Sequence, residues 1–195
     1  MGRHCAIFGF ALTLAASACM AEAVDTDTGL DQLMQHLAQR QHGHASFVER
    51  HFIAILDRSI ETSGELFYDA PDHLEKRTNL PKPESLILDR GTLSVHRGSH
   101  DFVLSLRDYA PVAPFIDSIR AILAGDLPAL NRTYTLVFAV EGDRWHLVLV
   151  PRDAKLAKVV AKIQVSGVND EIQTIEFERS GGDHSVMTIS ALPDP

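Results

Sequence analysis

Histidine is the residue type in this sequence that most strongly suggests chemistry, with ten among 195 residues. His42 and His44 flank Gly43, and two imidazoles so close together could contribute to a metal site. A metal site needs three or four converging ligands, and no zinc motif or Glu/His pair at helical spacing completes such a set. The histidines are therefore interpreted as surface residues, and no metal or other cofactor is expected.

The residues of hydrolytic enzymes are present, but not in the patterns that catalysis requires. The sequence has no G-x-S-x-G nucleophile elbow, and no glycine-rich phosphate loop follows a strand. Asp108 and Asp117 lie in unlike contexts, and nothing marks them as an acid/base pair. The sequence does not support an enzymatic activity.

The first residues have the organisation of a secretory signal peptide. A short polar region precedes an apolar run from Cys5 to Ala18, and Ala21 and Ala23 place small residues where a signal peptidase requires them. The run is shorter than the roughly 20 residues that span a bilayer. We expect cleavage after Ala23, which divides the chain into a signal peptide (1–23) and one exported domain (24–195).

Both cysteines, Cys5 and Cys19, precede the expected cleavage point. A mature chain that begins at residue 24 would have no disulfide, reactive thiol or thiolate metal ligand. Export without cysteines fits a bacterial periplasm. An alternative is that Cys19 belongs to a lipobox and carries a lipid anchor, although Ala16 stands where a branched apolar residue is usual.

The charge and composition limit the partners. The formal net charge is −8, and removing the signal peptide would delete one charge of each sign, Arg3 and Glu22. A negative domain is a poor match for nucleic acid or for an anionic membrane surface. The hydrophobic content of 45% suits a single globular domain with a sizeable core.

The chain is organised around residues 44–78, where we predict two long antiparallel strands, the second interrupted at Pro71. From Phe47 to Leu56 apolar residues fall on both faces: Phe47 and Ile53 on one, Val48 and Phe52 on the other. A sheet that is apolar on both faces must be covered on both, or must keep one face for a ligand.

The remaining pattern predicts a β-rich chain with few helices. Helical periodicity marks residues 28–40 and 111–124, and a brief helical turn follows Pro151. Further strands are predicted at 85–89, 93–97, 102–107, 133–140, 144–150, 159–166, 171–179 and 185–190. About ten strands in succession favour consecutive antiparallel pairing.

The helix at 111–124 has two interpretations. Its periodicity fits an ordinary core-packing helix. Combined with strands that are apolar on both faces, it also fits a helix that covers the concave side of a curved sheet and leaves a lined cavity. An acyl chain is the natural occupant, because its transfer from water is favourable by about 0.8 kcal/mol per methylene.

The order of elements and several segments resemble the bacterial outer-membrane lipoprotein carrier family LolA. The resemblance rests on residues 44–47 (HASF), on residues 64–74 with their G-x-L-x-x-x-x-P pattern, on residues 148–151 (VLVP) and on the strand, glycine turn and strand of residues 176–187. It spans nearly all of the expected mature chain.

The resemblance implies an α+β, mostly antiparallel fold: an unclosed half-barrel whose lid would be the helices at 30–40 and 111–124. It also implies a periplasmic, non-enzymatic carrier, expected to be a monomer, that takes a lipoprotein or lipid from an inner-membrane transporter to an outer-membrane acceptor. The residues expected to line the acyl-chain cavity and lid are Leu33, Leu37, Phe47, Phe52, Leu66, Tyr68, Leu74, Phe115, Ile116, Ile119, Leu136, Phe138, Trp145 and Leu147.

One departure from the family affects lid control. The family commonly has an arginine directly before the proline of the G-x-L-x-x-x-x-P pattern, whereas this chain has Ala70 before Pro71. Arg50 or Arg77 could take its place. The cargo is equally open between a lipoprotein, a free lipid, a glycolipid and a pigment ester. The competing functions are a lipid or lipoprotein sensor or regulatory binding protein on the same fold, and an enzyme on the same scaffold.

Overall fold

The computed structural model describes residues 26–108 and 113–193. The expected signal peptide, its cleavage site and the alternative anchor at Cys19 lie outside these residues. The helices are α1 (Thr26–Ala38), α2 (Ala113–Leu123) and α3 (Leu127–Thr133), with short 3₁₀ turns at Ala54–Leu56, Leu106–Asp108 and Leu156–Lys158. The strands are β1 (His42–Ile53), β2 (Arg58–Asp69), β3 (His73–Leu80), β4 (Glu84–Asp89), β5 (Thr92–Arg97), β6 (His100–Ser105), β7 (Tyr134–Glu141), β8 (Arg144–Pro151), β9 (Val160–Val168), β10 (Glu171–Arg179) and β11 (His184–Ala191).

All eleven strands form one antiparallel sheet in the order β6-β5-β4-β3-β2-β1-β11-β10-β9-β8-β7. Most consecutive strands pair as predicted, but the sheet departs from purely consecutive pairing in two ways. β1 pairs with β11 as well as with β2, from Ala45 opposite Ala191 to Phe52 opposite His184. β6 and β7 are consecutive in the chain but form the two edges of the sheet. The first and last strands therefore meet at the centre, and the opening lies between β6 and β7.

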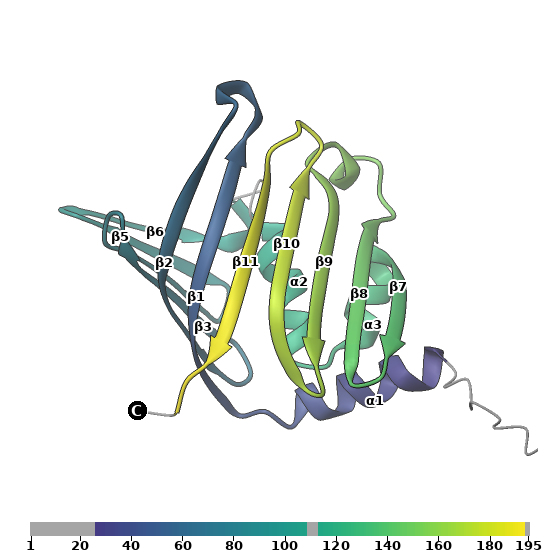
Figure 1. The fold of residues 1–195 in the computed structure, drawn as a ribbon. Coiled ribbons are helices and arrows are strands. Elements are labelled where there is room, and N and C mark those ends of the chain that lie inside the picture. Colours follow the sequence, from purple (N-terminus) through teal and green to yellow (C-terminus); the bar gives the residue numbers. More distant parts are fainter. Residues whose placement is uncertain (1–25, 109–112, 194–195) are drawn as a thin grey trace, which may run out of the picture.

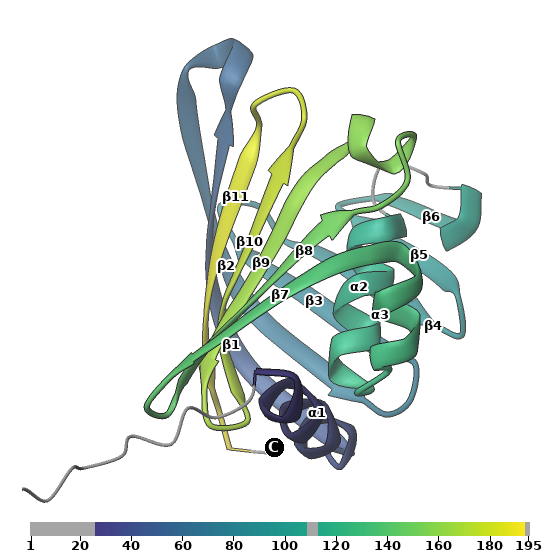
Figure 2. The ribbon, with the colours of Figure 1, turned by 90° about the vertical axis from the view of Figure 1, so that its right-hand side faces the viewer.

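The helices occupy the concave side of this open sheet. The sheet curves around α2 and α3, which the chain inserts between β6 and β7 (Figures 1 and 2). α1 lies across one end and contacts β7 and α2 (Figure 2). The expectation of an unclosed, mostly antiparallel half-barrel with helices on its concave side is confirmed.

The register shows which side chains face inward. Cross-strand partners point to the same face, so Phe47 of β1, Ile189 of β11 and Gly64 of β2 lie on the concave side. On the convex side Val48 and Val137 keep 44% and 56% of their surface exposed. The sequence predicts apolar residues on both faces of the sheet, but the helices cover only the concave face.

Two packed regions flank the concave side. The larger one joins α1 and α3 to β7–β11 around residues such as Leu37, Leu130 and Leu149. The smaller one consists of Leu88, Leu93 and Leu106, with apolar neighbours that include Ile116 of α2. α2 contributes to both regions, and the space between them lies in front of β1, β2 and β3.

Gly64 allows the sheet to bend sharply between β2 and β3. The register shifts between Ser63 and Gly64, which marks a bulge. A Cβ atom at position 64 would lie 1.9 Å from the carbonyl oxygen of Arg77, well inside any normal contact. Only glycine lets β3 approach this closely, and the bend turns the sheet into a half-barrel.

The structure corrects three details of the predicted elements. Pro71 lies in the turn between β2 and β3, so residues 44–78 form parts of three strands, and the sheet has eleven strands instead of about ten. The first strand ends at Ile53, because Ala54–Leu56 forms a 3₁₀ turn at a hairpin tip where Ile55 is 92% exposed. The helix α3 was not predicted; Asp126 caps its N-terminus by accepting a hydrogen bond from the Ala129 N–H at 2.9 Å.

Candidate functional site

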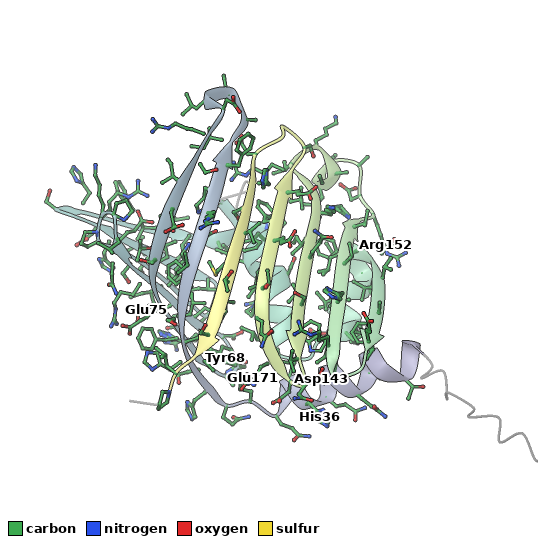
Figure 3. All side chains as sticks on the ribbon, viewed as in Figure 1. His36, Tyr68, Glu75, Asp143, Arg152 and Glu171 are labelled. Atoms are coloured by element: carbon green, nitrogen blue, oxygen red, sulfur yellow. The ribbon has the colours of Figure 1, made fainter. Side chains whose placement is uncertain are left out.

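A cavity of about 1010 Å³ lies between the concave face of the sheet and α2. This is at the upper end of the volumes usual for small-molecule sites. Its walls come from α1, α2 and the strands β1–β5, β10 and β11. Tyr68 and Glu171 both lie near the end of the sheet that α1 covers (Figure 3). Most of the lining is aliphatic or aromatic, so the cavity suits an apolar guest.

Eight of the fourteen residues predicted from the sequence line this cavity. They are Leu37, Phe52, Leu66, Tyr68, Leu74, Phe115, Ile116 and Ile119. They come from α1, β1, β2, β3 and α2. The structure thus brings them together around one space; that they bind an acyl chain stays a prediction.

The other six predicted residues belong to the packed core and do not line the cavity. They are Leu33, Phe47, Leu136, Phe138, Trp145 and Leu147. For Leu136 and Phe138 the physical reason is that α1 and α3 pack directly against β7, the strand that carries them. Trp145, for example, is 3% exposed and donates a hydrogen bond from Nε1 to the Asn169 carbonyl at 2.9 Å.

Sequence reasoning missed the wall that the C-terminal strands provide. Phe177 of β10 and Met187 and Ile189 of β11 line the cavity. β11 reaches the cavity because it pairs with β1, which places Met187 opposite Glu49. The alternation of apolar and polar residues in these strands could have identified their inward face, but not their neighbours.

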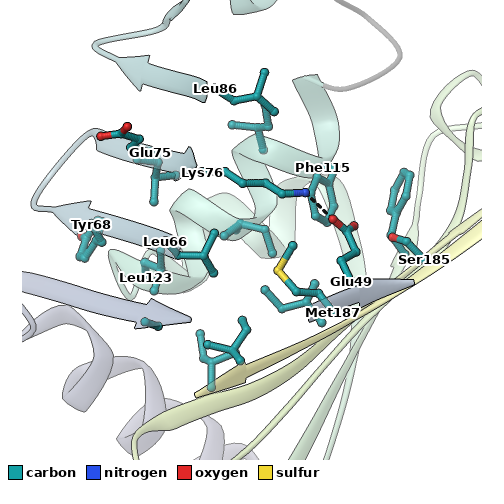
Figure 4. A pocket seen from close by; sticks show the side chains of 18 of the residues that line it. Glu49, Leu66, Tyr68, Glu75, Lys76, Leu86, Phe115, Leu123, Ser185 and Met187 are labelled. Carbon is teal, nitrogen blue, oxygen red and sulfur yellow. Dashed lines mark hydrogen bonds and ion pairs between the residues drawn. The ribbon is translucent and has the colours of Figure 1, made fainter. Parts of the chain in front are cut away.

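A charged cluster of three residues, Glu49, His51 and Lys76, lies within the apolar lining and was also missed. Glu49 is 4% exposed and forms an ion pair with Lys76, whose chain reaches it from β3 (Figure 4). His51 Nε2 lies 3.1 Å from the same carboxylate oxygen. Figure 4 places the Glu49–Lys76 contact between Phe115 of α2 and Met187 of β11. We call these three residues the charged cluster.

The carboxyl group of Glu49 is held in its ionised form. Burial by itself raises the pKa of this carboxyl, but hydrogen bonds from His51 and Lys76 and the positive charge of Lys76 outweigh burial and lower the pKa to about 2. The Lys76 ammonium group also lies 4.8 Å from the centre of the Phe47 ring, a cation–π distance. Glu49 therefore carries a negative charge at neutral pH, balanced by Lys76.

The two arginines considered as substitutes for the family arginine lie elsewhere. Arg50 pairs with Glu61 at 2.9 Å on strands β1 and β2. Arg77 pairs with Glu75 at 3.0 Å and covers the Phe67 ring. Within the described residues no ion pair joins either of them to α2.

The remaining candidates for chemistry are paired locally. His42 lies 2.7 Å from Asp69, and His44 lies 3.1 Å from Glu65 and stacks on Phe67. In residues 26–108 and 113–193, no three His, Cys, Asp or Glu side chains are grouped as a metal site would require. No helix in the same residues is long and apolar enough to cross a membrane.

The open half-barrel and its apolar cavity define a class of binding proteins for hydrophobic guests. The model of the family described as "Outer membrane lipoprotein carrier protein LolA-like" matches residues 18–191. Because the match covers most of the sequence, the chain belongs to this LolA-like family. No curated protein matches the sequence.

Three solved structures illustrate the likeness in fold. A LolA superfamily protein from Nitrosomonas europaea is 14% identical with a TM-score of 0.44, covering 88% of this chain and 96% of its own. A putative outer membrane lipoprotein-sorting protein domain from Vibrio parahaemolyticus is 8% identical with a TM-score of 0.46, covering 88% and 95%. The MucA/MucB complex of Pseudomonas aeruginosa is 14% identical with a TM-score of 0.48, covering 85% and 59%. At these scores the family assignment rests on the family model.

Proposed function

We propose that this protein is a periplasmic carrier that shields the acyl chains of a lipoprotein or lipid between an inner-membrane exporter and an outer-membrane acceptor. The observation that supports the proposal is the apolar cavity beneath α2. Burying a chain of sixteen carbons there would contribute roughly 13 kcal/mol from the hydrophobic effect alone, before the costs of binding. The site would need no covalent chemistry.

Release is as important to a carrier as binding. α2 is held between two packed regions and also forms one wall of the cavity, so a shift of α2 would change the volume open to cargo. A partner can drive such a shift only by binding the open form more tightly than the closed one. We propose that α2 is the moving lid and that α1 closes the end of the cavity.

The experiment is to express the full chain with its own N-terminus in a bacterium that has an outer membrane, and to purify the protein from the periplasm. Mass spectrometry of an organic extract should show co-purifying acylated lipid or lipopeptide. The purified protein should also bind a neutral apolar fluorophore, N-phenyl-1-naphthylamine. Absence of both lipid and fluorophore binding would refute the carrier proposal.

The same preparation tests the predicted processing. Mass spectrometry of the intact protein should give the mass of residues 24–195 if cleavage follows Ala23. A mass that begins at Cys19 and carries added acyl groups would instead support the lipid anchor.

A further inference from the structure

The charged cluster is placed where an ion pair is costly. Glu49 and Lys76 meet among apolar side chains from α2, β2 and β11 (Figure 4). Removing two charges from water offsets most or all of their attraction, and apolar residues of similar volume in their place are often as stable or more so. Stability alone therefore does not account for this pair in a cavity that otherwise suits hydrocarbon.

Lys76 has hydrogen-bonding capacity left over. An ammonium group has three N–H donors, and Lys76 donates to Glu49. In the described part of the chain it makes no further hydrogen bond, and its side chain is 24% exposed toward the cavity. The Lys76 ammonium group thus offers N–H donors to a guest in the cavity.

The charges of the cluster restrict which guest can use these donors. Glu49 neutralises Lys76, so a second carboxylate placed at Lys76 would be a buried charge without a partner. A neutral carbonyl oxygen has no such cost and accepts a charge-assisted hydrogen bond from an ammonium group. The geometry therefore favours a neutral acceptor flanked by apolar chain.

We propose that Lys76 donates a hydrogen bond to the ester or amide carbonyl that joins an acyl chain to its head group, with Glu49 holding the ammonium group in place. The cavity would then distinguish acylated cargo from hydrocarbons and ethers of the same length. Phe115 and Met187, on either side of the cluster, would contact the chain next to the carbonyl. This inference rests on the proposed function, because it assigns the polar contact of the same cargo.

The test compares two guests that differ by one carbonyl oxygen. 1-Monopalmitoylglycerol and 1-O-hexadecylglycerol have the same head group and chain length, and each is titrated against protein loaded with N-phenyl-1-naphthylamine. The ester should displace the fluorophore from the wild-type protein with about tenfold higher affinity, as expected for one hydrogen bond to a charged group. Palmitate should bind more weakly than the ester.

Two variants locate the preference. Glu49→Leu/Lys76→Met replaces both charges by apolar residues and should bind the two guests equally while still binding the fluorophore. Lys162→Met/Glu178→Leu removes another Lys–Glu pair, at 3.0 Å between β9 and β10 outside the cavity lining, and should keep the tenfold preference.

The outcomes separate this inference from the proposed function. Equal affinity for ester and ether in the wild-type protein would overturn the role of Lys76 while leaving the carrier proposal intact. A preference that persists in the Glu49→Leu/Lys76→Met variant would overturn it as well. If neither guest nor the fluorophore binds the wild-type protein, the carrier proposal itself fails. The wild-type comparison decides the question even if the double variant does not fold.

Discussion

Arg120 of α2 lies 3.4 Å from Asp72, which belongs to the turn between β2 and β3. The same guanidinium group lies 3.3 Å from Asp117 on its own helix. This contact joins the proposed lid to the turn that contains Pro71. Ala70 precedes Pro71 in this chain, and the guanidinium group that contacts the turn comes from α2.

We predict that Asp72→Asn will speed the opening of α2 with little effect on stability. Both side chains are at least one-third exposed, so the pair should contribute less than about 1 kcal/mol. Stopped-flow measurement should show faster dissociation of N-phenyl-1-naphthylamine, by up to about fivefold. Exchanging the charges, Asp72→Arg with Arg120→Asp, should restore the slower rate. The control Arg90→Gln removes an exposed pair with Asp89 in another turn and should leave the rate unchanged.

We predict that breaking the charged cluster on one side only will destabilise the fold. Lys76→Met leaves the 4%-exposed Glu49 without its cation, which should lower the free energy of unfolding by about 3–5 kcal/mol. Glu49→Leu/Lys76→Met should lie within about 1 kcal/mol of the wild-type protein. Urea titration followed by circular dichroism measures both. If Lys76→Met proved as stable as Glu49→Leu/Lys76→Met, the buried ion pair between Glu49 and Lys76 would be contradicted.

We predict that acid weakens the protein through Glu49. The pKa of this carboxyl is about 2 in the folded chain and 4.5 in the reference state, so the unfolded chain binds the proton more readily. The stabilisation, about 3 kcal/mol, is complete above pH 4.5 and is lost as the pH falls from 4.5 through 2. Urea titrations between pH 7 and 2 should show a steeper loss for the wild-type protein than for Glu49→Leu/Lys76→Met. If the free energy of unfolding fell equally with pH in both proteins, the lowered pKa of Glu49 would be contradicted.

We predict that Gly64→Ala will damage the half-barrel. The new methyl group would meet the carbonyl oxygen of Arg77, and this contact is to backbone, which cannot rotate away. We expect a loss of at least about 2 kcal/mol, because β3 must move. The matched control is Gly181→Ala, where a Cβ atom would meet nothing within 4 Å, and its stability should change by less than about 0.5 kcal/mol.

We predict that filling the cavity will abolish fluorophore binding without unfolding the protein. Leu86→Trp places an indole ring on the wall formed by β4. Its fluorophore affinity should fall at least tenfold while its circular dichroism spectrum is unchanged. Val103→Trp on the exposed side of β6, where Val103 is 71% exposed, should bind normally. Equal binding by both variants would show that the fluorophore binds elsewhere.

Periodicity within single segments predicted most of the elements. Residues 171–179 form the strand β10 with the predicted bounds, and the first helix lies within two residues of its predicted range. The seven-residue helix α3 was missed because it is too short for a helical repeat to be visible and contains Pro128. Its signal was the cap: Asp126 followed by a proline in the first turn.

Pairing between the ends of the chain could not be predicted in this way. Alternation shows which face of a strand is buried, but not which strand lies beside it. The cavity residues predicted from the sequence therefore included four on β7 and β8, which the helices cover, and none on β10 and β11, which line the cavity. The position of Glu49 could have been inferred in part from the sequence. Glu49 shares its strand face with Phe47 and Ile53, so the alternation places a charged side chain among inward-facing apolar ones.

The hydrogen bonding of β1 to β11 has a consequence for how the protein is made. β11, the last strand of the described residues, fills the middle of the sheet, so neither half can acquire its neighbour until residues 184–191 are available. Contacts of such large sequence separation form slowly, because a long loop must close first. A chain that ended before His184 would leave two partial sheets with exposed edges, prone to aggregate.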